Sequence, residues 1–174
     1  CPPGEVDYIS LQVNNFAGVE AEGLDFDLTY IIDTENAGRF DIGISGAKYT
    51  KYIVQSYPES PRIEYQGEMG LPDLRMNPHV YWGKGDWNVA LTGYYIAGQS
   101  EVIGGTTYDV GGHYEVNMQV EYQLPWDASV AFGATNLMNT GPETNGDYYG
   151  WYPLDWSLYD TRGRTAYIRY EQSL

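Results

Sequence analysis

Residues 114–122 read YEVNMQVEY, an unbroken alternation of apolar or aromatic side chains with polar ones. Successive side chains of a β-strand point to opposite faces, so this period of two predicts a strand with one apolar and one polar face. The same alternation recurs in residues 24–32, 40–45, 87–92, 128–135 and 165–170. Because no segment has a helical period instead, the sequence predicts an all-β fold.

The alternating segments predict an antiparallel meander of seven or eight long strands. The expected strands are residues 8–33, 38–54, 77–84, 86–98, 112–123, 127–138 and 164–172. The first of them is either one long strand or two strands separated at residues 14–18. An isolated sheet leaves two unpaired edges, and closed bacterial barrels have even strand numbers. An odd strand count therefore indicates one part of a larger structure.

The expected connections differ in length at the two ends of the strands. Tight turns rich in Asn, Gly, Asp and Pro are expected at residues 34–38, 84–86 and 124–127. Long links are expected at residues 57–75, 99–111 and 139–162. Short turns at one end and long loops at the other are typical of outer-membrane barrels. A soluble sandwich has no physical reason to keep this strict asymmetry.

The amino-acid composition limits the classes of binding partner that the chain can have. The formal net charge is −15, from 24 acidic and 9 basic residues, which argues against nucleic acid because phosphate binding needs clustered Lys and Arg. The chain contains 18 Tyr and 5 Trp but only 4 Phe. Such amphipathic rings suit a membrane interface or a sugar-binding platform. No apolar run is long enough for a transmembrane helix, and residues 1–4 show no signal-peptide pattern.

Four sets of short motifs, in order along nearly the whole chain, resemble the barrel of TonB-dependent outer-membrane receptors. The first set is NFAG at 15–18 with EGLDF at 22–26, and the second is LRMN at 74–77 with VYW at 80–82 and GDWNV at 85–89. The third is VEYQLPW at 120–126 with NL at 136–137, and the last is DTRGR at 160–164 followed by alternating aromatics. The resemblance implies that residues 1–174 are the C-terminal segment of a large transmembrane β-barrel, whose full form has about 22 strands around a plugged lumen.

The resemblance also implies a function and a location. Such receptors lie in the outer membrane of Gram-negative bacteria and import siderophores, cobalamin or oligosaccharides. The implied partners are outer-membrane lipid, the rest of the barrel and its plug, the TonB complex through that plug, and the barrel-assembly machinery through the last strand. The family usually ends on Phe or Trp, whereas this chain ends on Leu174, and neither a plug domain nor a TonB box is expected within these residues. The resemblance makes Cys1 half of an extracellular-loop disulfide; a lipid-modified cysteine and a free thiol are the alternatives.

The polar sides of the alternating strands are the candidate lumen lining. These candidates are Asp25, Asp27, Glu115, Asn117, Gln119, Glu121 and Arg169. Carboxylates on one strand do not face each other across a cleft, as a glycosidase requires. His79 and His113 lack further ligands at metal spacing. We therefore expect no enzyme activity, no metal and no cofactor.

Aromatic residues divide into loop and strand-end groups. The candidates for ligand capture crowd the last long loop and are Tyr148, Tyr149, Trp151, Tyr152, Trp156 and Tyr159. Those assigned to an interfacial girdle are Tyr57, Tyr65, Trp82, Trp87, Tyr94, Tyr95, Tyr122 and Trp126. Two alternatives to the receptor segment are compatible with the same patterns. One is a secreted β-sandwich that binds carbohydrate, and the other is a free-standing small outer-membrane barrel.

Overall fold

The computed structural model describes residues 4, 8, 18–144 and 155–173. All of its regular secondary structure is β. The strands are β1 (Gly18–Thr34), β2 (Gly38–Gln55), β3 (Ile63–Glu64), β4 (Leu74–Lys84), β5 (Trp87–Ile96), β6 (Gln99–Ile103), β7 (Thr106–Val110), β8 (His113–Leu124), β9 (Ala128–Thr135) and β10 (Thr165–Gln172). Within the described residues, no helix is long and apolar enough to cross a membrane.

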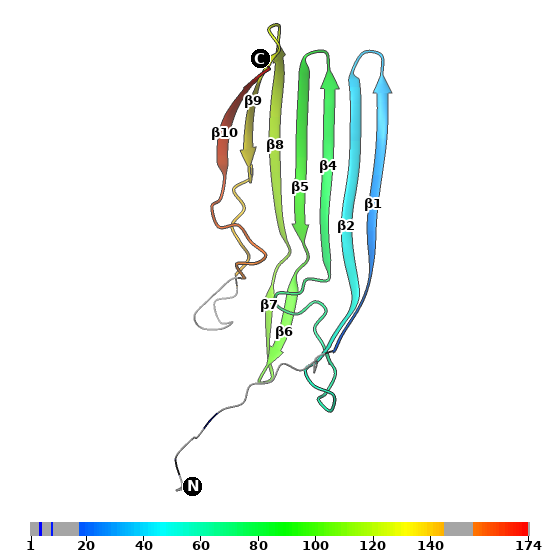
Figure 1. Ribbon diagram of the computed structural model, residues 1–174, viewed down its shortest axis with the longest axis vertical. Helices are drawn as coiled ribbons and strands as arrows, with labels where there is room; N and C mark the ends of the chain where they lie inside the picture. The colour runs from blue at the N-terminus through cyan, green and yellow to red at the C-terminus, as the bar shows by residue number, and fades with distance from the viewer. Residues whose placement is uncertain (1–3, 5–7, 9–17, 145–154, 174) are drawn as a thin grey trace.

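One antiparallel sheet contains all seven long strands in the order β1-β2-β4-β5-β8-β9-β10, as Figure 1 shows. The short strand β3 adds to β2, and β6 pairs with β7 in a separate two-stranded sheet. Each long strand therefore pairs with the next long strand along the chain. The predicted all-β antiparallel meander is confirmed, and the expected strands agree with the observed ones to within a few residues wherever the structure describes them.

The two ends of the sheet differ as the sequence predicts. The turns β1–β2, β4–β5 and β8–β9 lie together at the upper end in Figure 1, and the three long connections lie at the lower end. The link expected at residues 99–111 is mostly a hairpin rather than a loop, because β6 and β7 pair along their full length. Its turn has positive φ at both Gly104 and Gly105, as a tight two-residue hairpin turn requires.

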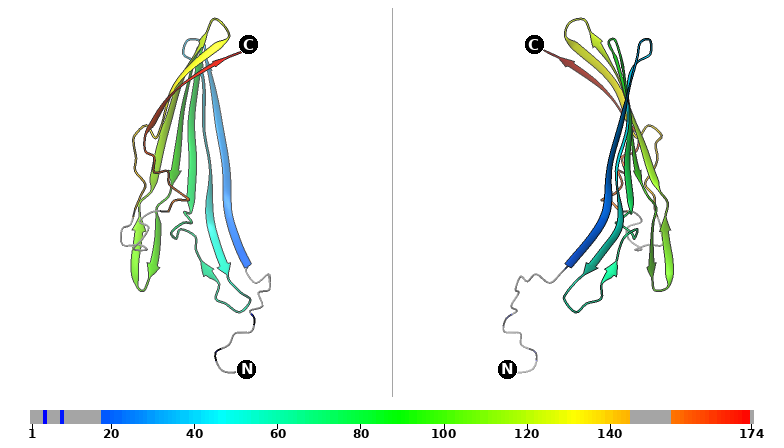
Figure 2. Two further views of the ribbon diagram at one scale, coloured as in Figure 1. Left: turned by 60° about the vertical axis from the view of Figure 1, so that its left-hand side comes forward. Right: turned by 90° about the vertical axis from the view of Figure 1, so that its right-hand side faces the viewer.

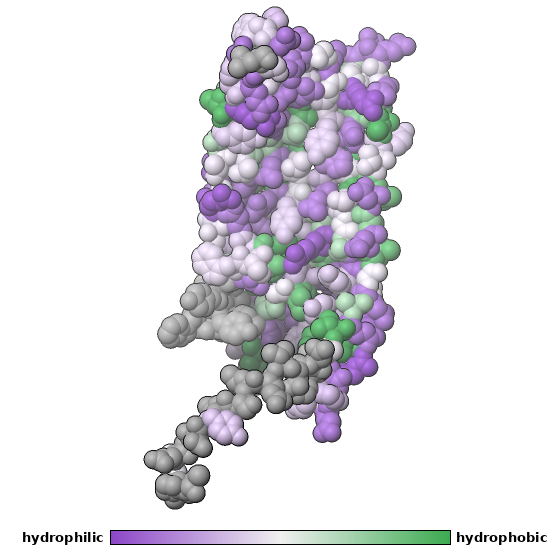
Figure 3. Space-filling model, viewed as in Figure 1, coloured by the Kyte–Doolittle hydropathy of each residue, from purple (hydrophilic) through white to green (hydrophobic). Residues whose placement is uncertain are grey.

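Directly paired residues share a face of an antiparallel sheet, so the register defines two surfaces. The first, the apolar face, carries Val120 of β8 beside Val89 of β5 and Phe132 of β9. The second, the polar face, carries Gln119 beside Ala90 and Gly133. Figure 3 shows the polar face, where purple and pale side chains predominate over the middle of the sheet.

The described chain buries few side chains. Ile96, Leu158 and Tyr159 form its core cluster, where a loop segment after β9 lies against the end of β5. Many large side chains elsewhere on the sheet are exposed, including Leu28 at 65% and Ile168 at 72%. The sheet is strongly twisted, as Figure 2 shows from two sides. The sheet does not enclose a core of its own.

Small residues on β9 let side chains of β10 reach across to β8. A Cβ at Gly133 would overlap the ring of Tyr167. That ring crosses β9 at the glycine, and its hydroxyl donates to Oε1 of Gln119 at 2.8 Å. Glycine at 133 is thus required by the close approach of an aromatic ring.

We predict that Gly133→Ala lowers the free energy of unfolding by about 1–3 kcal/mol, because the added methyl group displaces the Tyr167 ring. Urea titrations followed by circular dichroism measure the change. Gly141→Ala is the matched control, since nothing lies within 4 Å of its new Cβ. The cost should largely disappear when Gly133→Ala is introduced into a Tyr167→Ala background. An equal cost in both backgrounds would contradict the ring contact.

Candidate functional site

The apolar face is continuous across all seven long strands. Its uncharged residues include Leu24, Phe26, Leu28, Tyr30 and Ile32 of β1; Phe40, Ile42, Ile44 and Gly46 of β2; Leu74, Met76, Pro78, Val80 and Trp82 of β4; Trp87, Val89, Leu91, Gly93 and Tyr95 of β5; Tyr114, Val116, Met118, Val120, Tyr122 and Leu124 of β8; Ala128, Val130, Phe132 and Ala134 of β9; and Ala166, Ile168, Tyr170 and Gln172 of β10. Lys48 and Lys84 continue the same alternation at the loop end and the turn end of the face. Many of the large apolar side chains are exposed, so no layer of the described chain covers this face.

Aromatic rings mark both ends of the apolar face on its central strands. At the turn end, the rings of Trp87 and Tyr122 lie 4.7 Å apart between centroids. At the loop end, Tyr95 is paired with Tyr114 on the same face. Each of β5 and β8 thus runs nine residues from one ring to the other, counted inclusively. That length matches the roughly 9–11 residues of a tilted strand that crosses a bilayer.

Further rings at the turn end form polar contacts at the edge of the apolar face. Nε1 of Trp126 donates to the Tyr170 hydroxyl at 3.3 Å, and Nε1 of Trp82 donates to the carbonyl oxygen of Ala37 at 2.7 Å. Trp82, Trp87, Tyr95 and Tyr122 lie at the ends of the apolar face, and their part in an interfacial girdle stays a prediction. Tyr94 instead lies on the polar face and packs against the core cluster. Tyr94 and Tyr95 lie on opposite faces because successive side chains of a strand alternate.

All seven candidates for the lumen lining lie on the polar face. Five of them gather on β8 and β10: Glu115, Asn117, Gln119, Glu121 and Arg169. Asp25 and Asp27 share the face but belong to β1, at the far edge of the sheet. The structure thus brings the β8 and β10 candidates together and leaves the β1 pair apart.

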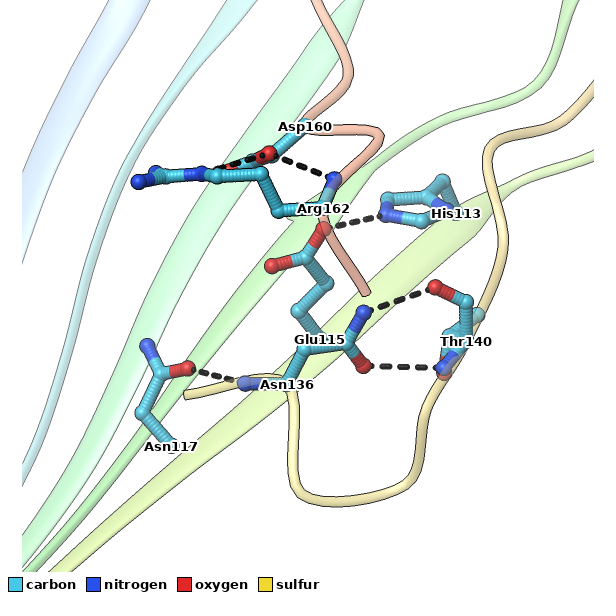
Figure 4. Close-up of polar contacts among 7 residues, drawn as sticks. All are labelled: His113, Glu115, Asn117, Asn136, Thr140, Asp160 and Arg162. Carbon is cyan, nitrogen blue, oxygen red and sulfur yellow. Dashed lines mark hydrogen bonds and ion pairs between the residues drawn. The ribbon is translucent and has the colours of Figure 1, made fainter. Parts of the chain in front are cut away.

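Side chains on β8 are linked to β10 and to the strand connections. Nη2 of Arg169 lies 3.1 Å from Oε2 of Glu121. Oδ1 of Asn117 accepts from the backbone N–H of Asn136 at 2.8 Å. The Asn136 side chain in turn makes two hydrogen bonds of 2.8 Å with the backbone of Thr140 (Figure 4). These links hold the start of the β9–β10 connection against β8.

A buried histidine lies where β8 begins. Nε2 of His113 is 3.0 Å from Oε1 of Glu115, as Figure 4 shows, and the His113 side chain is fully buried. Its ring meets the ring of Tyr159 edge-on at 5.0 Å, and its Nδ1 has no hydrogen-bond partner among the described residues. From the sequence, this histidine is expected to have a structural or surface role, and the structure places it inside the protein. Its contacts are those of a packing residue for the loop that carries Tyr159.

Gln99 joins three segments that are far apart in the sequence. It is 4% exposed; its Oε1 accepts from the backbone N–H of Gly70 at 2.6 Å, and its Nε2 donates to the Tyr159 hydroxyl at 3.2 Å. The β2–β4 and β9–β10 connections therefore meet at the start of β6. We call Gly70, Gln99 and Tyr159 the loop cluster. Sequence reasoning missed Gln99, since a lone glutamine carries no pattern.

Several loop residues have shifted pKa values, and Tyr159 and Asp160 bear on the β9–β10 connection. Burial raises the pKa of the Tyr159 hydroxyl above its usual range, and the nearby carboxylate of Glu143 adds to the effect. Hydrogen bonds from the side chain and backbone of Arg162 lower the pKa of Asp160 to about 2. Figure 4 shows this guanidinium–carboxylate contact beside the start of β8. The Asp160 carboxylate therefore stays ionised in mild acid.

The predicted capture loop is described only in part. Trp156 is 62% exposed, whereas Tyr159 is 6% exposed and packs inside the protein. Tyr159 thus differs from the expected free ring, because it fills the space beside Ile96 and His113. Tyr148, Tyr149, Trp151 and Tyr152 lie outside the described residues, as does Cys1. A ligand-binding role for Trp156 stays a prediction.

Within the described residues, no group of three or more His, Cys, Asp or Glu side chains is placed to hold a metal ion. No family model, curated protein or solved structure matches the chain. The fold and the two faces therefore define an amphipathic antiparallel sheet with one open apolar surface.

We predict that Gln99→Ala speeds hydrogen exchange at the Gly70 amide by roughly tenfold or more, because the amide loses its acceptor and the Tyr159 hydroxyl loses a donor inside the protein. Exchange followed by mass spectrometry measures the effect on the β2–β4 connection. Gln123→Ala is the control, since its side chain bonds only to Glu121 among the described residues. Unchanged exchange at Gly70 would contradict the loop cluster.

We predict that the Asp160 carboxyl titrates with a midpoint of about 2. The contact with Arg162 favours the ionised form, so it persists through the ordinary Asp range near 3.8 and is lost only as the pH falls through about 2. Arg162→Gln should move the midpoint up toward 3.8, whereas Arg164→Gln should not. Carboxyl carbon NMR measures both, and a midpoint insensitive to Arg162→Gln would contradict the assignment.

Proposed function

We propose that the chain forms part of the wall of an outer-membrane β-barrel of the TonB-dependent receptor type. The observation that carries the proposal is the open apolar face, nine residues tall between aromatic rings on β5 and β8. Outer-membrane barrels have an outward apolar band flanked by aromatic girdles and a polar interior. In this proposal the apolar face contacts lipid and the polar face lines the lumen.

The extent of the open surface favours lipid over water as its surroundings. Burial of apolar area yields roughly 25 cal/mol per Å², so side chains such as Leu28 and Ile168 forgo much of this stabilisation if they face water. A β-sandwich would cover the same face with a second sheet about 10 Å away. Within the described residues no such sheet is present. Contact with lipid removes the apolar face from water without a second layer of protein.

Both edges of the sheet favour a larger closed barrel. β1 and β10 each have one neighbour among the long strands, so one side of each leaves backbone groups unpaired. A bilayer core offers no water to these groups, and spanning sheets therefore close on themselves. The proposed partners are thus further strands of the same barrel beside β1 and β10, with outer-membrane lipid around them.

The proposal gives the loop end a role in uptake. Short turns face the periplasm in outer-membrane barrels and longer connections face the exterior. The loop cluster and the exposed Trp156 would then lie outside the cell, where a ligand is first captured. Force transmitted by the TonB complex to a plug would drive import of a siderophore, cobalamin or an oligosaccharide.

We predict that Leu91→Arg strongly lowers the yield of folded protein in the outer membrane. Leu91 lies midway along the apolar face of β5, and a charge facing lipid at that depth costs about 2–4 kcal/mol. Thr92→Arg is a matched control, because the next residue of the same strand faces the polar side. The resistance of the unboiled protein to unfolding in detergent gels, measured on isolated outer membranes, quantifies folding.

The same experiment can also contradict the proposal of a lipid-facing apolar face. If Leu91→Arg and Thr92→Arg give the same yield, the apolar face does not contact lipid. A wild-type gene product that is recovered as a water-soluble monomer without detergent would also overturn the proposal, and would favour a carbohydrate-binding sandwich instead.

A further inference from the structure

The polar face is hollowed near the turn end of the sheet. The hollow has a volume of about 390 Å³ and spans β2, β4, β5 and β8. Its polar lining side chains are Arg39, Asp41, Tyr81, Asn88, Gln119 and Glu121. The volume falls within the roughly 300–1,000 Å³ that is usual for small-molecule sites.

The hollow exists because two small residues lie at its centre. Gly83 pairs with Asn88, and Ala90 pairs with Tyr81 on the neighbouring strand. Neither Gly83 nor Ala90 fills the space above the sheet, while longer side chains surround them on β2 and β8. The shape of the hollow is therefore encoded by the register of β4 against β5.

Several polar groups around the hollow are free to bind a ligand. The Asn88 amide and the Tyr81 hydroxyl make no hydrogen bond with another described residue, and the Tyr81 side chain is exposed. Gln119 uses only its Oε1, for the Tyr167 hydroxyl, which leaves its amide N–H groups available. The Tyr81 ring is held in place by stacking on His79, with centroids 4.7 Å apart. Donors, acceptors and one aromatic ring thus converge on one space.

The charged side chains at the hollow already contact other polar groups. Glu121 lies 3.1 Å from Arg169, Arg39 lies 3.6 Å from Asp33, and Asp41 lies 3.4 Å from the His79 ring. An ionic ligand would have to compete with these contacts. An apolar ligand would leave the amides and the hydroxyl unpaired, which is costly. The chemistry that remains is a neutral ligand rich in hydroxyl groups.

We propose that the hollow binds a neutral saccharide. Hydroxyl groups of the sugar would pair with Asn88, Gln119 and Asp41, and the C–H face of a sugar ring would lie on the Tyr81 ring. The inference rests on the proposed function for the role of the ligand, since a saccharide on the lumen face names the class of molecule imported. The binding chemistry itself depends only on the polar face.

Titration calorimetry on the full gene product in detergent micelles tests the proposal, with maltotriose, cellotriose and chitotriose as separate probes. We expect saturable binding of at least one. Ala90→Trp fills the hollow and should weaken that binding by more than tenfold. Asn88→Ala removes one hydrogen-bonding group at the surface and should weaken it about five- to tenfold. Ala47→Trp is the matched control on the same face, beside Arg75 rather than the hollow, and should change the dissociation constant less than twofold.

Two results would overturn the saccharide site. One is the absence of saturable binding of all three probes to wild-type protein that is folded in the outer membrane. The other is equal weakening by Ala47→Trp and Ala90→Trp, with each variant shown to be folded by its resistance to unfolding before it is boiled. Binding by a protein that never reaches the outer membrane would support the hollow and overturn the barrel proposal, so the two failures are distinguishable.

Discussion

The antiparallel pairing of long neighbouring strands is the constraint on which the rest of the structure depends. Paired residues share a face, so the register carries the alternation of each strand across the whole sheet. Met118 lies beside Leu91 on one side of β8 and beside Ala134 on the other. A shift of one residue in any pair would move polar side chains onto the apolar face. Both surfaces therefore exist only because every register agrees.

The polar face combines small and large side chains in a way that decides what it can do. Gly133 admits the Tyr167 ring and lets it reach β8, which ties the last three strands together. Gly83 and Ala90 leave a space that no neighbouring side chain fills. A small residue on an inner strand thus lets a side chain cross the strand at Gly133, and leaves a hollow at Gly83 and Ala90. The difference lies in whether a neighbouring side chain crosses the small residue, as the Tyr167 ring crosses Gly133, or stays beside it and lines the space.

The loop end is held by contacts that differ in kind from those of the sheet. Backbone pairing organises the strands, whereas side chains such as Gln99, His113 and Asn117 position the connections. Tyr159 links the connections to the strands, since its ring packs on His113 at the start of β8 and its hydroxyl accepts a hydrogen bond from Gln99. In the proposed barrel, these contacts would set the shape of the extracellular surface.

The sequence by itself determined the all-β class, the strands, the tight turns and the common face of the seven polar candidates, because a period of two is local and strong. It also separated the ends of the sheet, since turn residues mark short connections. Only the tertiary structure decided that Tyr159 is buried and that Gln99 joins two connections. Those outcomes depend on register and on contacts between residues distant in sequence, and neither leaves a local pattern.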